Sequence, residues 1–265
     1  MLVITMTSWT ARINNVTAVL KTVLNQTLCP DSVYLNLSKQ EFENKTLPEE
    51  LISFISNNPI IKLNWVDGPN TKPFKKIFPI LKYLKDDDII INIDDDMLLP
   101  KTFIESRIKD FKKYNTCISG LQSKPIRGYA GGLLPEVRHY FGAGSVYQKK
   151  MFRNWEKLLN DEIINTTHDD AFYCFMSWLN GWVPESCSEF DSFTIDDLAE
   201  EETSIHGNIG CAGPIEATRI NIKRFKEVYK TAPCYNFFKT NTKLKQVEKK
   251  KDTRADGQSN CFLYF

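Results

Sequence analysis

Short apolar runs alternate with segments of helical spacing through the first 120 residues, and this alternation restricts the fold more than any other feature. Apolar strands are predicted at Leu2–Met6, Val33–Leu37, Ile61–Val66 and Ile89–Ile93, with another beginning at Cys117. Helices are predicted between them at 16–24, Pro48–Ile55, Lys75–Leu84 and Phe103–Phe111. Because the strands are nearly continuous apolar runs, we expect an α/β fold with a mostly parallel central sheet and helices on both faces.

The amino-terminal half is therefore Rossmann-like, but it lacks the signatures of dinucleotide and P-loop sites. No G-x-G-x-x-G follows the first strand, and no G-x-x-x-x-G-K-[ST] occurs in the chain. Open parallel sheets bind ligands beyond the carboxyl ends of their strands. We therefore expect the functional residues in the loops that follow the strands.

Charge and cysteine content exclude several classes of protein. The chain has 34 Lys and Arg against 33 Asp and Glu, and a net charge of +1 provides no general attraction for nucleic acid. Its seven cysteines form no C-x-x-C pair, which favours reduced thiols in a cytoplasmic protein. A signal peptide and an apolar run of the ~20 residues that a membrane span needs are not evident. We expect a cytoplasmic protein without a nucleic-acid partner.

Three consecutive carboxylates, Asp94, Asp95 and Asp96, directly follow the strand predicted at Ile89–Ile93. Successive side chains of an extended segment point to opposite sides, so Asp94 and Asp96 are expected to converge while Asp95 points away. Carboxylates this close repel one another unless a cation lies between them, and Mg²⁺ or Mn²⁺ prefers such oxygen ligands. A solvated acidic turn is the alternative, and it is our interpretation of Asp86–Asp88. The apolar segments on both sides of Asp94–Asp96 favour the metal site.

With these features the chain resembles the GT-A glycosyltransferases, which use nucleotide-sugar donors, and most closely the exostosin-type transferase domain. The elements that carry the resemblance follow that family's order and are Phe78–Leu81, the apolar strand, Asp94–Asp96, Tyr129–Gly132, Gly142–Ser145 and Asp169–Asp170. The resemblance extends from about residue 3 to residue 180. It implies a GT-A fold with a smaller acceptor-side region of strands and loops, and a metal that bridges the donor's diphosphate.

The resemblance also implies which residues contact the donor. Thr7, Ser8 and Arg12 in the first loop are expected to bind the nucleotide, although Arg12 can equally cap the sheet edge. Lys75 is expected beside the diphosphate, with Lys72 and Lys76 as alternatives in the same segment. The other implied contacts are Asn36 and Asp67 to the base, Asp94 and Asp95 near the metal, and Gly142, Gly144 and Ser145 around the sugar. Arg254 is expected to contact the diphosphate, and a surface ion pair is the alternative for this residue.

Asp169 and Asp170 open a predicted apolar helix that runs through Trp178. Carboxylates at a helix start stabilise it by roughly 1 kcal/mol, and this explains at least one of them. The resemblance implies that Asp170, beside Asp169, lies at the reacting centre, as general base in an inverting reaction or as charge stabiliser or nucleophile in a retaining one. It also implies that His206 completes the metal shell with Asp94 and Asp96, a structural histidine being the alternative.

We therefore expect one domain over 1–265, with a nucleotide-sugar half at 1–119, an acceptor and catalytic half at 120–238 and a basic tail at 239–265. The expected activity is metal-dependent transfer of a hexosyl or N-acetylhexosaminyl group from a UDP-sugar to a glycan or lipid-linked acceptor, as in bacterial-type surface polysaccharide or lipooligosaccharide synthesis. The tail is expected to contact the inner face of a membrane, a solvated helix being the alternative. A sugar-nucleotide nucleotidyltransferase and a non-catalytic carbohydrate- or cation-binding module stay open.

Overall fold

The computed structural model describes residues 1–120, 144–166, 169–182 and 184–188, together with 124–125, 138–139, 220–221, 223–224 and 227–228. The chain divides into two compact units, which are Met1–Gln122 with Phe141–Lys150 and Glu185–Ile209, and Ser123–Tyr140 with Met151–Pro184 and Gly210–Phe265. The expected division at residues 119 and 238 stays a prediction.

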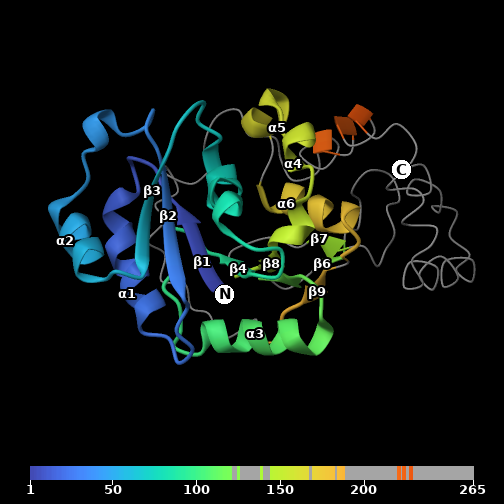
Figure 1. The fold of residues 1–265 in the computed structure, drawn as a ribbon, viewed down its shortest axis with the longest axis horizontal. Helices are drawn as coiled ribbons and strands as arrows, with labels where there is room; N and C mark the ends of the chain where they lie inside the picture. The colour runs from blue at the N-terminus through green and yellow to red at the C-terminus, as the bar shows by residue number, and fades with distance from the viewer. Residues whose placement is uncertain are drawn as a thin grey trace, which may run out of the picture. The chain divides into compact units, whose positions relative to one another are not determined.

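A seven-stranded sheet forms the centre of the first unit, in the order β3-β2-β1-β4-β8-β5-β9 (Figure 1). The strands are β1 Leu2–Thr7, β2 Ser32–Ser38, β3 Ile61–Val66, β4 Ile89–Asn92, β5 Ile118–Ser119, β8 Val146–Gln148 and β9 Glu185–Ser186. β1 pairs in parallel with β2 and β4, and β2 pairs in parallel with β3. β8 runs antiparallel to its neighbours β4 and β5. The predicted mostly parallel sheet is confirmed.

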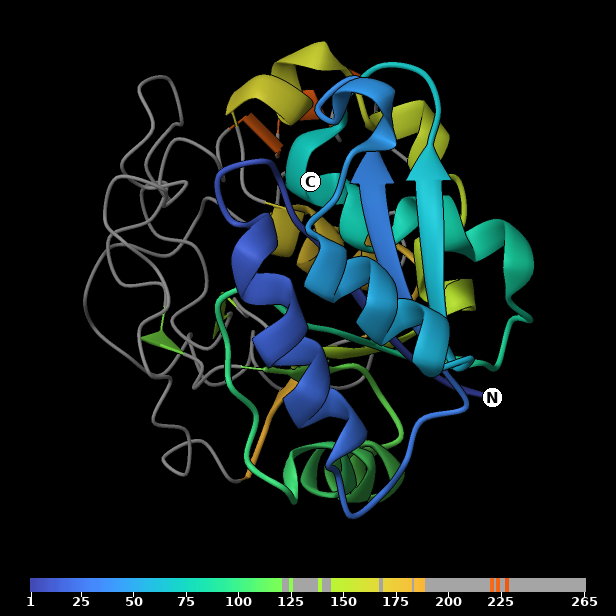
Figure 2. The ribbon, with the colours of Figure 1, turned by 90° about the vertical axis from the view of Figure 1, so that its left-hand side faces the viewer.

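Two helices, α1 (Val16–Leu24) and α2 (Glu49–Asn57), cover one face of β1, β2 and β3. Figure 2 shows these helices in front of β2 and β3, whose arrowheads point to the same edge. The apolar residues of α1 that recur at helical spacing are buried, as the sequence predicted. A third helix, α3 (Phe103–Tyr114), ends at Asn115 in the left-handed conformation, with φ 50°.

The segment predicted as one helix at Lys75–Leu84 instead forms two 3₁₀ turns, η3 (Lys72–Lys76) and η4 (Phe78–Tyr83). Pro73 and Pro79 stand in the first positions of these turns. A proline inside an α-helix removes a hydrogen bond and clashes with the carbonyl four residues earlier, so Pro79 prevents a continuous helix here. The two turns lie on the face of β1 and β2 opposite to α1 and α2 (Figure 1).

The described part of the second unit contains short helices and short strands. They are α4 (Trp155–Leu158), α5 (Asp161–Thr166) and α6 (Asp169–Leu179), with the strands β6 (Lys124–Pro125) and β7 (Arg138–His139). The predicted helix after Asp169–Asp170 is confirmed as α6. Asn154 takes a left-handed conformation with φ 64° immediately before α4. Within the described ranges, no helix has both the length and the apolar character that crossing a membrane requires.

Candidate functional site

The carboxylates Asp94, Asp95 and Asp96 lie immediately beyond β4, where basic side chains from two other segments meet them. Nη1 of Arg12, in the loop after β1, lies 3.1 Å from Oδ1 of Asp95 and 2.9 Å from Oδ2 of Asp96. Nζ of Lys76, at the end of η3, lies 2.5 Å from Oδ1 of Asp94. Three negative and two positive charges leave one net negative charge on these five side chains.

Asp95 is the most buried of the three carboxylates. Its side chain is 8% exposed, against 32% for Asp94 and 20% for Asp96. The Ser8 hydroxyl donates a hydrogen bond of 2.6 Å to Oδ2 of Asp95. Burial raises the pKa of Asp95, and the bonds from Ser8 and Arg12 oppose this rise. Asp95 therefore ties the loop after β4 to the loop after β1, and the other two carboxylates keep more contact with solvent.

Asp94 and Asp96 have the chemistry of a divalent cation site. Burial raises the pKa of Asp96, and repulsion from Asp94 adds to the rise. Oδ2 of Asp94 and Oδ1 of Asp96 have no hydrogen-bond or ion-pair partner among the described residues. Mg²⁺ and Mn²⁺ fit such a donor set, since they bind through one or two carboxylates and complete their shell with water and phosphate oxygens. Among the described residues, no group of three or more His, Cys, Asp and Glu is placed to hold a metal ion.

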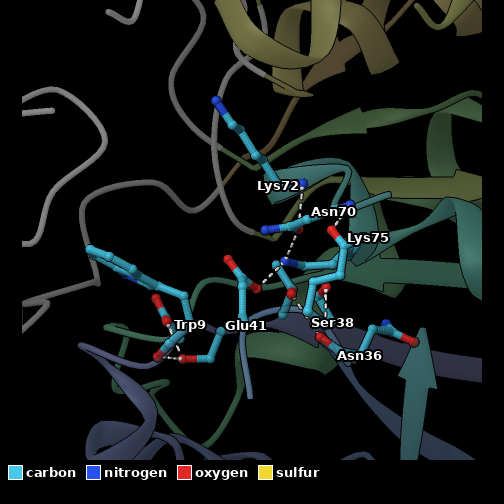
Figure 3. Close-up of polar contacts among 11 residues, drawn as sticks. Trp9, Asn36, Ser38, Glu41, Asn70, Lys72 and Lys75 are labelled. Carbon is cyan, nitrogen blue, oxygen red and sulfur yellow. Dashed lines mark hydrogen bonds and ion pairs between the residues drawn. The ribbon is translucent and has the colours of Figure 1, made fainter. Parts of the chain in front are cut away.

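A second buried cluster is centred on Lys75, which lies beside the ends of β2 and β3 (Figure 3). The Lys75 side chain is 2% exposed, and its Nζ lies 2.5 Å from Oε2 of Glu41 and 2.6 Å from Oδ1 of Asn70. Asn70 also accepts a hydrogen bond of 3.0 Å from the backbone N–H of Lys72. Burial lowers the pKa of Lys75, and Glu41 opposes this change. Lys75 therefore joins η3 to the loops that follow β2 and β3.

Asn36 lies in a row of hydrogen bonds that crosses β1, β2 and β3. Its side chain is fully buried; Nδ2 donates to Oγ1 of Thr5 at 3.0 Å, and Oδ1 accepts from Nδ2 of Asn64 at 2.8 Å. The Asn36 amide and the Thr5 hydroxyl both donate to the carbonyl of Lys76, and the Thr7 hydroxyl donates to the Asn36 carbonyl. Asn36 and Thr7, which were predicted to contact the nucleotide, thus belong to the framework that holds the main chain of Lys76.

Three other predicted site residues, Asp67, Asp169 and Asp170, have their own local surroundings. Asp67 lies in an exposed loop after β3, 2.5 Å from Nζ of Lys39, whose hydrogen bond lowers the pKa of Asp67. Asp169 and Asp170 form the first turn of α6, which agrees with their predicted stabilisation of that helix. The role predicted for Asp170 at a reacting centre stays a prediction. The remaining predictions, on Gly142, His206 and Arg254, lie outside the described residues.

Gly144 and Ser145 lie beside the last residue of β4. The N–H of Gly144 donates to the carbonyl of Asn92 at 2.5 Å, and Oγ of Ser145 accepts a hydrogen bond of 2.9 Å from the N–H of Gly120. Gly144 has φ +85°, and a Cβ added to it would lie 2.4 Å from Cζ of Phe103. Phe103 is a core residue, 1% exposed, so its ring has little room to move.

We expect Gly144→Ala to lower the free energy of unfolding by about 2 kcal/mol, since it combines left-handed strain with overpacking. Gly68→Ala is the matched control, because Gly68 has φ +83° but nothing within 4 Å of its added Cβ. Urea denaturation measures both variants. Equal losses of stability would contradict the steric role assigned to Phe103.

The sequence named Lys76 only as an alternative to Lys75 and did not single out Glu41. Lys76 rather than Lys75 faces the carboxylates, and Glu41, which was not singled out, pairs with Lys75. Pro79 was the available signal that this segment is not one continuous α-helix.

Comparison with known proteins identifies the fold through structure. No protein-family model and no curated protein sequence matches this chain. The crystal structure of S. aureus TarS 1-349 in complex with UDP matches with a TM-score of 0.55 and 10% identity, over 96% of this chain and 72% of that one. A mannosyltransferase from Pyrobaculum calidifontis, PcManGT, in complex with GDP-Man and Mn²⁺, matches with a TM-score of 0.56 and 11% identity, over 93% and 68%. This is the GT-A fold.

The GT-A fold confirms the predicted fold class. The sequence identities are too low to establish a closer relationship. Another structure of S. aureus TarS matches over 71% of this chain and 35% of that one, so this chain corresponds to about a third of that protein. A 4-diphosphocytidyl-2C-methyl-D-erythritol synthase also matches, with a TM-score of 0.50 and 10% identity, over 76% of this chain and 94% of that one.

Proposed function

We propose that this chain is a metal-dependent glycosyltransferase that moves a sugar from a UDP-sugar donor to a glycan or lipid-linked acceptor. The observation that carries the proposal is the pair Asp94 and Asp96 beyond β4, each with a carboxylate oxygen that no described residue binds. The structural neighbours support it, since TarS 1-349 was crystallised with UDP and with UDP-GlcNAc, and the mannosyltransferase with GDP-Man and Mn²⁺. An exostosin-type transferase, transferring a hexosyl or N-acetylhexosaminyl group, is the finer form of the proposal.

In this proposal Asp94 and Asp96 hold the metal, with His206 as a further ligand. Bound there, Mn²⁺ or Mg²⁺ would neutralise the charge that develops on the departing diphosphate. Asp95 keeps Arg12 in place beside Asp96, so that a fixed positive charge stays at the site. Lys76 takes the place that the sequence assigned to Lys75, because its ammonium group is the one beside the carboxylates. Asp170 acts at the reacting centre, as general base in an inverting reaction or as charge stabiliser or nucleophile in a retaining one.

A donor-hydrolysis screen tests the proposed activity. Purified protein is incubated with UDP-, GDP- and CMP-sugars, with Mn²⁺ or with EDTA, and release of the nucleoside diphosphate or of CMP is measured. We expect release from UDP-sugars that depends on Mn²⁺. Equal release in EDTA would contradict the metal, and release from GDP-sugars alone would contradict the UDP assignment.

The likeness to the 4-diphosphocytidyl-2C-methyl-D-erythritol synthase supports a second candidate, a nucleotidyltransferase that makes an activated sugar. Against it, the loop from Thr7 to Arg12 after β1 contains no glycine, whereas such enzymes usually carry a glycine-rich loop there. Nucleoside triphosphates with a sugar 1-phosphate distinguish the two, because only a nucleotidyltransferase would release pyrophosphate from this mixture.

A further inference from the structure

Lys76 forms an ion pair with a carboxylate that the proposed metal would also bind. Its Nζ lies 2.5 Å from Oδ1 of Asp94, and its side chain is 9% exposed. We infer that Lys76 is a positioning residue that changes partner: it neutralises Asp94 while the donor site is empty, and turns to the diphosphate of the donor when a divalent cation binds Asp94 and Asp96. The inference rests on the proposed function and extends it, because it makes the binding of metal and donor cooperative.

The main chain of Lys76 is fixed, so the exchange requires movement of its side chain alone. The carbonyl of Lys76 accepts hydrogen bonds from the Thr5 hydroxyl and the Asn36 amide, which lie within the sheet. A lysine side chain is a point charge on a flexible four-carbon stem and can reach different partners from one backbone position. Asp94, the partner to be released, is the most exposed of the three carboxylates.

Each of the two neighbouring basic groups contacts two acceptors. Nζ of Lys75 is bound by both Glu41 and Asn70 in a side chain that is 2% exposed. The Arg12 guanidinium bridges Asp95 and Asp96, and Asp95 is itself fixed by Ser8. We assign the exchange to Lys76 because its partner Asp94 is the most exposed of the three carboxylates.

Electrostatic interactions determine whether Lys76 opposes or favours metal binding. A divalent cation and an ammonium group cannot share Asp94 without repulsion, so Lys76 opposes metal binding when no donor is present. Once the donor brings its diphosphate, the ammonium gains an anionic partner and the same charge favours the complex. Each ligand then strengthens the other by the same factor, as linkage requires.

Binding of Mn²⁺, with and without UDP, tests the inference in the Lys76→Met variant. Free Mn²⁺ is measured by electron paramagnetic resonance and UDP binding by calorimetry. Relative to wild type, we expect the variant to bind Mn²⁺ about tenfold tighter when UDP is absent. We also expect the factor by which UDP increases Mn²⁺ affinity to be about tenfold smaller in the variant. Lys150→Met is the matched control, because Lys150 pairs with the exposed Asp87 in another acidic run, at 2.7 Å, and should leave both quantities unchanged.

The outcomes separate this inference from the proposed function. If wild type binds Mn²⁺ and UDP cooperatively and Lys76→Met keeps both quantities within twofold, the exchange by Lys76 is wrong and the proposed function stands. If wild type binds no Mn²⁺ even with UDP, the metal-dependent function fails and the inference fails with it. Lys76→Gln provides the same comparison should the methionine variant not fold, as judged by thermal unfolding.

Discussion

An Asp96→Asn variant is expected to lose Mn²⁺-dependent donor turnover by about 10³-fold while it stays folded. Asparagine keeps an oxygen that can accept the bond from Arg12, so the contact of 2.9 Å between these side chains can persist. It removes the negative charge and one of the two carboxylates that suit the metal. Steady-state turnover of the best UDP-sugar measures the loss, and Mn²⁺ binding by electron paramagnetic resonance should weaken in parallel.

The other acidic run of the chain offers a control for this variant. Asp87 is 81% exposed and pairs with Lys150 on the surface, which agrees with the solvated turn predicted for Asp86–Asp88. The prediction is wrong for Asp88, which is buried and binds the amino-terminal ammonium at 2.9 Å. Asp87→Asn removes the same charge and should leave turnover within twofold. If Asp96→Asn kept wild-type, metal-dependent turnover, Asp96 would not be a metal ligand.

The framework of the site could be predicted from the sequence because it depends on local patterns. Each apolar run became a strand, and the ends of the predicted strands from Leu2 to Ile93 differ from β1 to β4 by at most one residue. The carboxyl end of a parallel strand is where open α/β sheets keep their sites, so the position of Asp94–Asp96 at that edge followed directly. A strand that is buried on both faces is apolar at nearly every position, and this pattern can be recognised without knowing which distant residues pack against the strand.

The partners of the charged side chains could not be predicted in the same way. Glu41 and Lys75 are 34 positions apart, and Arg12 and Asp95 are 83 apart, so their pairing depends on where separate loops meet. Lys75 and Lys76 are adjacent and chemically identical, yet one faces Glu41 and the other Asp94. A 3₁₀ turn separates neighbouring side chains by about 120°, and only the tertiary position of η3 determines which lysine reaches which acid.

Arg12 stabilises the charged forms of two carboxylates, Asp95 and Asp96, that burial would otherwise destabilise. Its side chain is 11% exposed, and Asp95 opposite it is 8% exposed. Arg12→Met leaves the Asp95 carboxylate buried without its cation, and breaking a buried pair in this way costs about 3 kcal/mol. We therefore expect the free energy of unfolding to fall by about this amount near pH 7.5. Lys21→Met, which breaks the exposed pair with Glu50, should cost less than about 1 kcal/mol.

The loss in Arg12→Met should depend on pH with a definite sign. The pKa values of Asp95 and Asp96 are already raised in the folded chain, and removal of Arg12 raises them further. When a folded-state pKa exceeds the unfolded value, the folded chain holds a proton that the unfolded chain has lost, so stability falls as the pH rises through that window. The difference from wild type should therefore be small near pH 4 and grow toward neutral pH. Urea denaturation at pH 4.5 and pH 7.5 measures it, and a loss that is equal at both values would show that Arg12 acts through packing and not through charge.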